Sequence, residues 1–173
     1  MVCASQKPPD KRNNKQTEKR QCIETTNNDK YMISSDILIS AIKTFEGCKL
    51  FAYRDSVGIP TIGYGHTSGV KMGTAITQKQ AEDYLREDLK KFENYVNKLA
   101  VCKTQGQFDA LVDFAYNCGT GNLSKSTLLK YIRAGKSDKD IQAQFLRWNK
   151  AGGKVLAGLT KRRTWESQRW TQK

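Results

Sequence analysis

The sequence predicts an α+β fold, with a small antiparallel sheet near the start of the folded part and a larger set of helices after it. Apolar residues recur at helical spacing before residue 46, and the same spacing returns from residue 77 onward. Between these segments, glycines interrupt β-branched and aromatic residues, as in short strands joined by tight turns. At 173 residues and 38% hydrophobic content, the chain is expected to form one compact domain.

Residues 1–31 are predicted to form a disordered or weakly ordered basic tail outside the folded domain, which spans residues 32–173. The tail has few apolar side chains, so burial cannot offset the entropy lost on ordering. Its first apolar run ends after residue 4, too early for a secretory signal, and no segment has the roughly 18 apolar residues of a membrane span. These features predict a monomer made in the cytoplasm without a signal peptide.

The first helix is expected to begin after a cluster of N-cap residues at Ser34, Ser35 and Asp36. Gly47 suits the position that follows a helix C-terminus. Glu46 therefore lies in the last turn, where the helix dipole disfavours a negative charge and favours the protonated carboxyl. One face of this helix is apolar: Ile37, Leu38, Ala41, Ile42 and Phe45.

The segment from residue 50 to about residue 72 is predicted to form the sheet, because its apolar residues are separated by turn-forming residues. The apolar residues are Tyr53, Val57, Ile59, Ile62 and Tyr64, and the interruptions are Asp55-Ser56, Gly58, Pro60, Gly63, Gly65 and Gly69.

Helices are predicted for the rest of the chain. Thr77 and Gln80 fit a capping box before a helix of about six turns that continues to Leu99 and is long enough to connect two lobes. Thr104 and Gln107 repeat the capping pattern before a second helix. Further helices are expected at about residues 124–134, 137–148 and 154–170, separated by Gly135 and by Gly152-Gly153.

The formal net charge of +13 predicts a polyanionic partner: nucleic acid, an anionic lipid surface or an acidic cell-wall polymer. The five cysteines are an odd number without the spacing of metal ligands, so neither a disulfide framework nor a metal site is predicted. Cys102 and Cys118 lie at opposite ends of a predicted helix, too far apart for a disulfide.

Hydrolysis of a glycosidic bond needs an acid that protonates the leaving oxygen and a second group that activates water or attacks the carbon. Two carboxylates in different environments can fill these two roles. Glu46 at the end of an apolar helix suits the acid, and Asp55 in a polar turn suits the ionised partner. The alternative interpretation makes Glu46 a surface acid and Asp55 a turn former.

An ordered set of motifs favours the catalytic interpretation: Phe45-Glu46-Gly47, Tyr53-Arg54-Asp55-Ser56-Val57-Gly58 and Pro60-Thr61-Ile62-Gly63-Tyr64-Gly65-His66. With these motifs the sequence resembles the bacteriophage lysozymes, or endolysins, of glycoside hydrolase family 24. Glu46, Asp55 and Thr61 fall on the Glu-Asp-Thr catalytic triad of that family. The resemblance continues through residues 114–119, 126–129 and 158–166, and covers residues 32–170.

The resemblance implies a lysozyme-like fold, with a glycan-binding cleft between a small β lobe and a larger helical lobe. It implies a muramidase that hydrolyses the β-1,4 bond between N-acetylmuramic acid and N-acetylglucosamine in peptidoglycan, with inversion and without a cofactor or metal. Glu46 is expected to be the general acid, and Asp55 and Thr61 are expected to position or activate water. The protein is then expected to reach the cell wall by release or delivery.

Further site residues are predicted with an alternative beside each. The resemblance makes Arg162 and Arg163 candidate substrate-binding residues, in a basic segment near the cleft that can pair with the catalytic glutamate. The alternative is a solvated helix face. Asn117 and Ser126 are candidates for glycan contacts, or a helix cap and an exposed helix residue. His66 is predicted to be a structural hydrogen-bonding residue rather than a catalytic one.

The three tryptophans of the terminal helices are predicted as core for Trp148, and as core or sugar-stacking residues for Trp165 and Trp170. Two functions from other classes remain open. One is a basic nucleic-acid-binding module, for which the sequence has no recognised motif. The other is a wall-binding protein that has this fold without catalysis.

Overall fold

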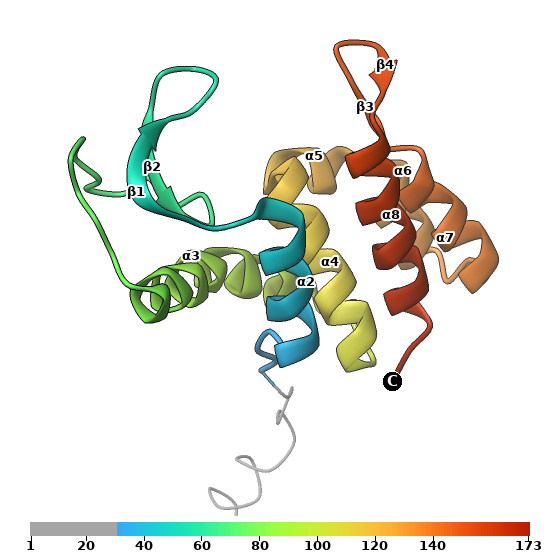
Figure 1. Ribbon diagram of the computed structural model, residues 1–173. Helices are drawn as coiled ribbons and strands as arrows, with labels where there is room; N and C mark the ends of the chain where they lie inside the picture. Colours follow the sequence, from blue (N-terminus) through green and yellow to red (C-terminus); the bar gives the residue numbers. More distant parts are fainter. Residues whose placement is uncertain (1–30) are drawn as a thin grey trace, which may run out of the picture. The chain divides into compact units, whose positions relative to one another are not determined.

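The structure is a computed structural model that describes residues 31–173 (Figure 1). Apart from Tyr31, the predicted tail lies outside the described residues. The described elements are α2 (Asp36–Glu46), β1 (Lys49–Arg54), β2 (Pro60–Gly63), α3 (Gln78–Leu99), α4 (Gln105–Cys118), α5 (Thr120–Lys125), α6 (Thr127–Arg133), α7 (Asp138–Leu146), β3 (Lys150–Ala151), β4 (Lys154–Val155) and α8 (Ala157–Trp170).

Helix α2 forms where the sequence predicts it. The Ser35 side chain accepts a hydrogen bond from the backbone N–H of Leu38, which caps the first turn. Gly47 ends the helix at a φ of 68°, and its N–H donates to the carbonyl of Lys43. Leu38 and Ile42 are fully buried, so the apolar face of α2 packs into the core.

The sheet is small and antiparallel, as predicted. Strand β1 pairs with β2 in the register Lys49 to Gly63 and Tyr53 to Thr61, so β1 advances four residues while β2 advances two. The extra residues form a bulge, which bends a strand and increases its twist. A returning segment completes the β lobe, here defined as residues 49–76, because Ile76 donates its N–H to the Leu50 carbonyl at 2.9 Å.

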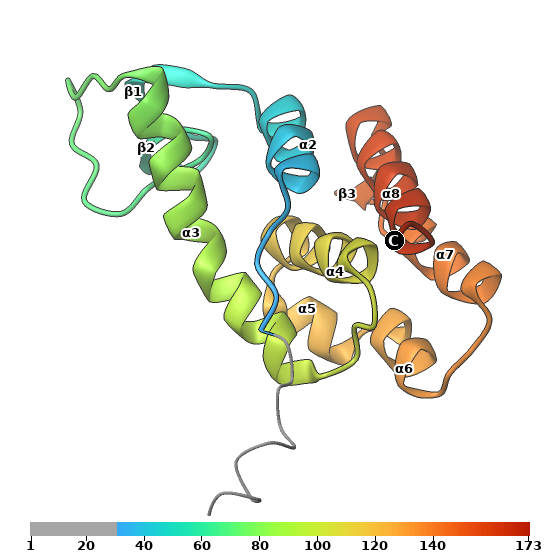
Figure 2. The same ribbon diagram turned by 90° about the horizontal axis from the view of Figure 1, so that it is seen from below.

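The long helix α3 joins the β lobe to the other helices. It begins with the predicted capping box of Thr77 and Gln80 and contacts both β2 and α4. Helix α4 is the centre of the helical part, because every residue from Phe108 to Ala115 has 0% exposure. Figures 1 and 2 show α4 flanked by α2, α3, α5 and α8, with the β lobe and α8 on opposite sides.

The structure corrects the predicted boundaries in the last third of the chain. A helix from residue 154 is wrong, because β3 and β4 form a hairpin there and α8 begins at Ala157. Gly152 and Gly153 both adopt positive φ, at 55° and 78°, which a two-residue hairpin turn of this kind requires. Helix α5 is an addition that the sequence reasoning missed, and α6 and α7 are shorter than predicted.

Tryptophan and cysteine placements agree with two further predictions. Trp148 packs edge-on against Phe114 at a ring-centroid distance of 5.2 Å, and Trp170 is 3% exposed in the core.

Cys102 and Cys118 are free thiols, and burial raises the pKa of the Cys102 thiol to about 12. Among residues 31–173, none of the helices has both the length and the apolar character to cross a membrane.

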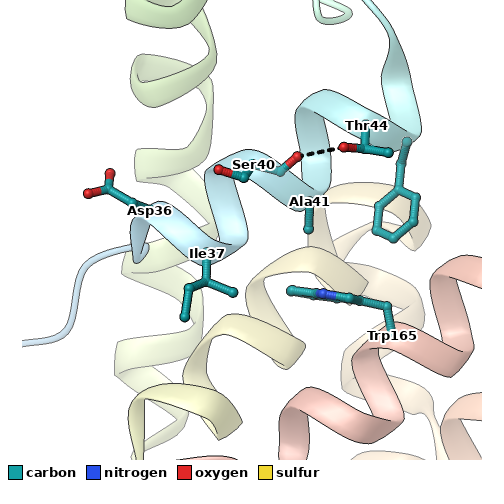
Figure 3. A pocket seen from close by; sticks show the side chains of 7 residues that line it. Asp36, Ile37, Ser40, Ala41, Thr44 and Trp165 are labelled. Atoms are coloured by element: carbon teal, nitrogen blue, oxygen red, sulfur yellow. Dashed lines mark hydrogen bonds between the residues drawn. The ribbon is translucent and has the colours of Figure 1, made fainter.

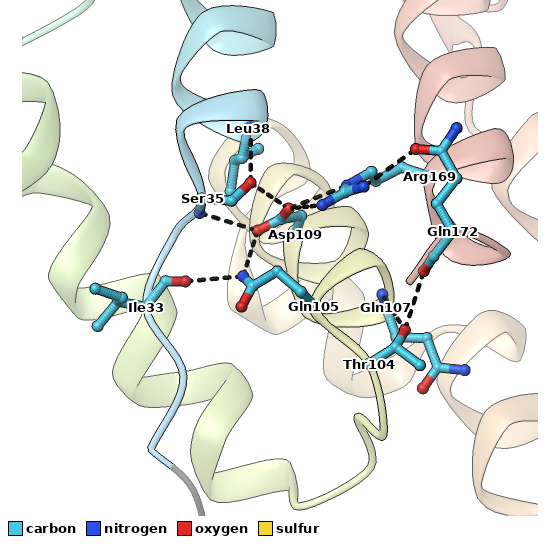
Figure 4. A network of polar contacts seen from close by, with 9 residues as sticks. All are labelled: Ile33, Ser35, Leu38, Thr104, Gln105, Gln107, Asp109, Arg169 and Gln172. Atoms are coloured by element: carbon cyan, nitrogen blue, oxygen red, sulfur yellow. Dashed lines mark hydrogen bonds and ion pairs between the residues drawn. The ribbon is translucent and has the colours of Figure 1, made fainter.

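A buried polar network ties the beginning of the domain to α4 and α8 (Figure 4). Asp109 has 0% exposure and accepts hydrogen bonds from the Ser35 hydroxyl at 2.6 Å and from Arg169 Nη2 at 2.7 Å. Gln105 donates to Asp109 and to the carbonyl of Ile33. The buried carboxylate is therefore fully used in holding three chain segments together.

Gly106 allows the first turn of α4 to approach the end of α8. A Cβ atom at Gly106 would lie 2.2 Å from the carbonyl oxygen of Gln172 and 2.3 Å from that of Arg169. We expect Gly106→Ala to lower the free energy of unfolding by roughly 2 to 3 kcal/mol, because backbone must shift to make room. Urea denaturation followed by circular dichroism measures this.

The matched control is Gly121→Ala in α5, where a Cβ would have nothing within 4 Å. That variant is expected to be at least as stable as the wild type, because alanine favours a helix more than glycine does. Equal stabilities for the two variants would contradict the close approach at Gly106.

Candidate active site

Glu46 is the last residue of α2, and its side chain reaches across to α8. Its Oε1 accepts a hydrogen bond from Arg162 Nη1 at 2.6 Å. The Glu46 side chain is 29% exposed, whereas the Arg162 side chain is 4% exposed. The carboxylate is therefore held from the buried side and open on the other. Arg162 adds a positive charge that opposes the effect of the helix end on the carboxylate. The composition of the sequence does not reveal this contact.

A polar pocket of about 310 Å³ lies beside Glu46, between the β lobe and the helices. Its lining comes from four parts of the fold: Glu46 of α2, Gly65 and Thr67 of the loop after β2, Asp88, Lys91 and Phe92 of α3, and Tyr116 and Asn117 of α4. The pocket lies where the resemblance predicts a cleft. Asn117 is exposed and lines it, whereas Asp55 and Thr61 are not among its lining residues.

Asp55 lies in the loop between β1 and β2. Its Oδ1 accepts backbone N–H bonds from Val57 at 2.9 Å and from Ile59 at 2.8 Å. The carboxylate thus shapes the turn, as the alternative interpretation expects, and the same bonds fix its position. A turn-forming role and a catalytic role are compatible here, because Oδ1 alone accepts both backbone bonds and Oδ2 accepts neither of them.

Thr61 lies on β2, is 3% exposed and donates its hydroxyl proton to the carbonyl of Ile59 at 2.9 Å. The same carbonyl accepts the backbone N–H of Asp55 at 3.0 Å. Ile59 therefore links Asp55 and Thr61 through its backbone. These two residues come together at the turn end of the hairpin, while Glu46 precedes the other end of β1.

Arg162 and Arg163 of α8 are both buried, so the alternative of a solvated helix face is wrong. Arg162 donates through Nε and Nη2 to the two oxygens of Asp113, at 2.9 and 2.8 Å. Arg163 has 0% exposure and donates to Asn117 Oδ1 at 3.0 Å. With no exposed surface, Arg163 cannot contact a glycan, which corrects its assignment as a substrate-binding residue.

Ser126 is also misassigned by the sequence. It is 3% exposed and caps α6, since its hydroxyl donates to the carbonyl of Leu123 and accepts the N–H of Leu129. Neither a glycan contact nor an exposed helix position fits these bonds.

His66 has a structural environment, as predicted. Its Nδ1 lies 2.9 Å from Asp88 Oδ2, its Nε2 lies 3.0 Å from the carbonyl of Ser68, and its ring stacks on Tyr84. Both ring nitrogens therefore lie within hydrogen-bond distance of protein oxygen atoms.

Tyr116 and Asp113 are site residues that the sequence reasoning missed. The Tyr116 hydroxyl donates to the Tyr64 carbonyl at 2.8 Å, joining α4 to the β lobe at the pocket. Burial, followed by the negative charge of Glu46, raises the pKa of Tyr116 above its ordinary value. The available signal was the pair Asp109 and Asp113 within an apolar helix, because buried carboxylates require partners.

A second pocket, of about 590 Å³, lies on the outer face of α2 and contains none of the predicted catalytic residues (Figure 3). Ile37 and Ala41 of α2 and Trp165 of α8 form its apolar wall. Trp165 is half-buried and packs edge-on against Phe45 at 6.0 Å. This tryptophan is thus a partial core residue and does not line the polar pocket.

The phage lysozyme family model matches residues 43–166. This range includes Glu46, Asp55, Thr61, Arg162 and Arg163. The chain belongs to the phage lysozyme family. The resemblance stated from the motifs is therefore confirmed.

Two relatives illustrate the range of similarity. This lysozyme-family chain is 50% identical over 135 residues to the endolysin of Bacillus phage PZA, covering 74% of this chain and 51% of that protein. It is 42% identical over 127 residues to the endolysin of Acyrthosiphon pisum secondary endosymbiont phage 1, covering 70% and 86%. The chain spans about half the length of the Bacillus phage PZA and B103 endolysins.

Solved structures confirm the predicted lysozyme-like α+β fold. The endolysin from Escherichia coli O157:H7 phage FAHEc1 matches with a TM-score of 0.74 and 42% identity, covering 82% of this chain and 94% of that one. The muramidase domain of SpmX from Asticaccaulis excentricus matches with a TM-score of 0.75 and 32% identity, covering 81% and 98%.

The buried acid Glu166 is expected to make the free energy of unfolding depend on pH. It has 0% exposure and lies 2.6 Å from Arg163 Nη2. Burial, followed by the negative charge of Asp113, raises the pKa of Glu166 well above its usual range. Since the folded protein keeps a proton that the unfolded chain releases, this contribution to stability is complete below about pH 4.5. It falls as the pH rises toward the raised value.

Glu166→Gln removes this dependence because glutamine does not ionise. We expect the free energy of unfolding of the variant, relative to the wild type, to grow above about pH 4.5 by up to about 1.4 kcal/mol per pH unit. Urea denaturation at several pH values between 4 and 7 measures the difference. Glu87→Gln, at an exposed carboxylate, is the control and is expected to give a flat difference. A flat difference for Glu166→Gln as well would show that Glu166 ionises normally.

Proposed function

We propose that this domain is a muramidase that hydrolyses the β-1,4 bond between N-acetylmuramic acid and N-acetylglucosamine in bacterial peptidoglycan. The observation that carries the proposal is the Glu46 carboxylate, fixed by Arg162 at 2.6 Å and open to a polar pocket. The family and the names of its relatives, endolysins and a muramidase domain, support the same activity. We further propose that residues 32–173 form the whole catalytic domain.

Glu46 is the general acid in this proposal. Cleavage needs a proton at the glycosidic oxygen as the bond to the anomeric carbon breaks, and a carboxyl group facing the pocket supplies it. Arg162 keeps the carboxyl in one orientation, which reduces the reorganisation needed when the proton is transferred. The exposed side of Glu46 is the side on which the glycan would lie.

Asp55 and Thr61 act together on the attacking water. Two backbone N–H bonds fix Asp55 Oδ1, and we assign Oδ2 to a water molecule. The Thr61 hydroxyl donates to the Ile59 carbonyl, so its lone pairs are directed to accept a proton of the same water. A water held by two acceptors presents its oxygen to the anomeric carbon. As this oxygen bonds to the carbon, the water gives a proton to Asp55 Oδ2, and attack from the face opposite Glu46 leads to inversion.

Asn117 completes the proposed site as a glycan contact from the α4 wall of the pocket. The net charge of +13 favours encounter with an anionic cell wall through a long-range, salt-sensitive attraction. We propose that the protein acts on the wall as a monomer after release or delivery from the cytoplasm.

Glu46→Gln tests the acid. Because a neutral amide cannot donate the proton, we expect the variant to lose roughly 100- to 10,000-fold in the rate of peptidoglycan hydrolysis. Turbidity loss of purified peptidoglycan, followed by mass analysis of the released sugars, measures the reaction. Glu87→Gln removes an exposed carboxylate of α3 outside the pocket and is expected to leave the rate unchanged.

Lysis by Glu46→Gln at the wild-type rate would reject Glu46 as the acid. If the wild type released no sugars, the muramidase proposal would fall. Binding to peptidoglycan without turnover would then favour a wall-binding protein, and binding to DNA would favour the nucleic-acid alternative.

The anomeric form of the new reducing end tests the role of Asp55. Attack by a water held at Asp55 and Thr61 predicts the α anomer as the first product, because the substrate bond is β. Proton NMR of a soluble glycan oligomer, recorded before mutarotation, identifies it. A first product in the β form would instead make Asp55 a nucleophile that attacks carbon directly.

A further inference from the structure

The buried side of Glu46 contains a chain of charges that the proposed reaction does not use directly. Arg162 contacts Glu46 through one nitrogen, Nη1, and contacts Asp113 through the other two. Asp113 has 0% exposure and lies on α4, whereas Arg162 lies on α8. The guanidinium therefore joins a carboxylate in the core to a carboxylate in the pocket.

The geometry at Asp113 restricts Arg162 to one orientation. Two parallel N–H bonds to one carboxylate fix the plane of a guanidinium as well as its position. The rings of Phe45 and Tyr116 lie 5.2 and 5.7 Å from the Arg162 guanidinium carbon, which further limits its movement. With Nε and Nη2 on Asp113, Nη1 has only the direction toward Glu46 left.

We propose that Asp113 is a positioning residue for Glu46, and that it orients the proposed acid and sets its charge environment through Arg162. The inference rests on the proposed role of Glu46 as general acid. Asp113 carries the negative charge that balances Arg162, so Glu46 lies beside a nearly neutral pair. Without Asp113, the positive charge of Arg162 would act on Glu46 uncompensated and favour its ionised form.

The other charged groups around Glu46 do not replace Asp113. Asp88 and Lys91 of α3 line the pocket with opposite charges, and Tyr116 of α4 is held neutral by burial. None of these groups has a hydrogen bond to Arg162 among the described contacts of residues 31–173.

Asp109 gives the matched control, because it is another fully buried acid of α4 that pairs with an arginine of α8. That arginine is Arg169, and Asp109 has no hydrogen bond to Arg162 or Glu46 among the described contacts. Asp109→Asn therefore removes the same negative charge as Asp113→Asn from the same helix without touching Arg162. Glu166 does not serve as a control, because the negative charge of Asp113 acts on it and raises its pKa.

Asp113→Asn and Asp109→Asn are compared with the wild type in two measurements. Carbon-13 NMR of the Glu46 carboxyl follows its titration without any need for activity. The pH profile of kcat for peptidoglycan hydrolysis follows the protonated acid. We expect Asp113→Asn to move the titration midpoint of Glu46 and the alkaline limb of kcat to lower pH by about one unit. On the alkaline side, one unit is about a tenfold loss of rate. KM should change less than twofold, and Asp109→Asn should match the wild type in both measurements.

Three outcomes overturn the inference: an unchanged midpoint and limb in Asp113→Asn, the same shift in both variants, or a loss of rate without a shift. Asp113→Ser, which leaves room for a water to accept from Arg162, is the second variant if Asp113→Asn does not fold. Failure of both to fold would assign Asp113 to stability alone and also overturn the inference. An inactive wild type would reject the proposed function, whereas the NMR titration would still decide the link from Asp113 to Glu46.

Discussion

The charge of Arg162 is the constraint on which the site depends. A guanidinium that is 4% exposed must be balanced, and Asp113 and Glu46 share that task. The same arrangement recurs farther along the two helices, where Asp109 of α4 pairs with Arg169 of α8. The earlier acid pairs with the later arginine, so the two ion pairs fix α4 and α8 in one antiparallel register. Burial of α4 and presentation of Glu46 therefore follow from the same contacts.

The remaining catalytic candidates depend on local structure instead. Asp55 and Thr61 are held by bonds within the turn between β1 and β2, centred on the backbone of Ile59. Side-chain contacts fix the β lobe on the helices, namely Tyr116 to the Tyr64 carbonyl and His66 to Asp88. The proposed acid and the proposed water-binding pair thus belong to two separately stabilised parts, joined by side-chain hydrogen bonds beside the pocket.

The sequence predicted the elements whose signals are local. Helix α3 has a capping box and a long apolar face, and α2 has a serine cap and a terminal glycine, so both were predicted to within a residue or two. Helix α5 has six residues and no side-chain cap, which gives too little pattern to detect. Burial of Arg163 could not be predicted from a local pattern, because it results from the packing of α8 on α4. Ser126 was not recognised as a cap because the helix expected from residue 124 divides there, and α6 begins at Thr127. Motif order identified Glu46, Asp55 and Thr61 as candidates, but it contained no sign that Asp113 lies behind Arg162.

The division of the site explains why a buried ion pair is tolerated beside an acid. A hydrophobic contact would hold α8 against α4 at no cost in desolvation, yet it would present nothing to Glu46. Arg162 satisfies both needs, because a guanidinium has enough donors to serve Asp113 and Glu46 at once. A lysine has only a point charge and could not fix two carboxylates in one plane. Burying these charges costs stability, but it holds the carboxylate that faces the pocket in one orientation.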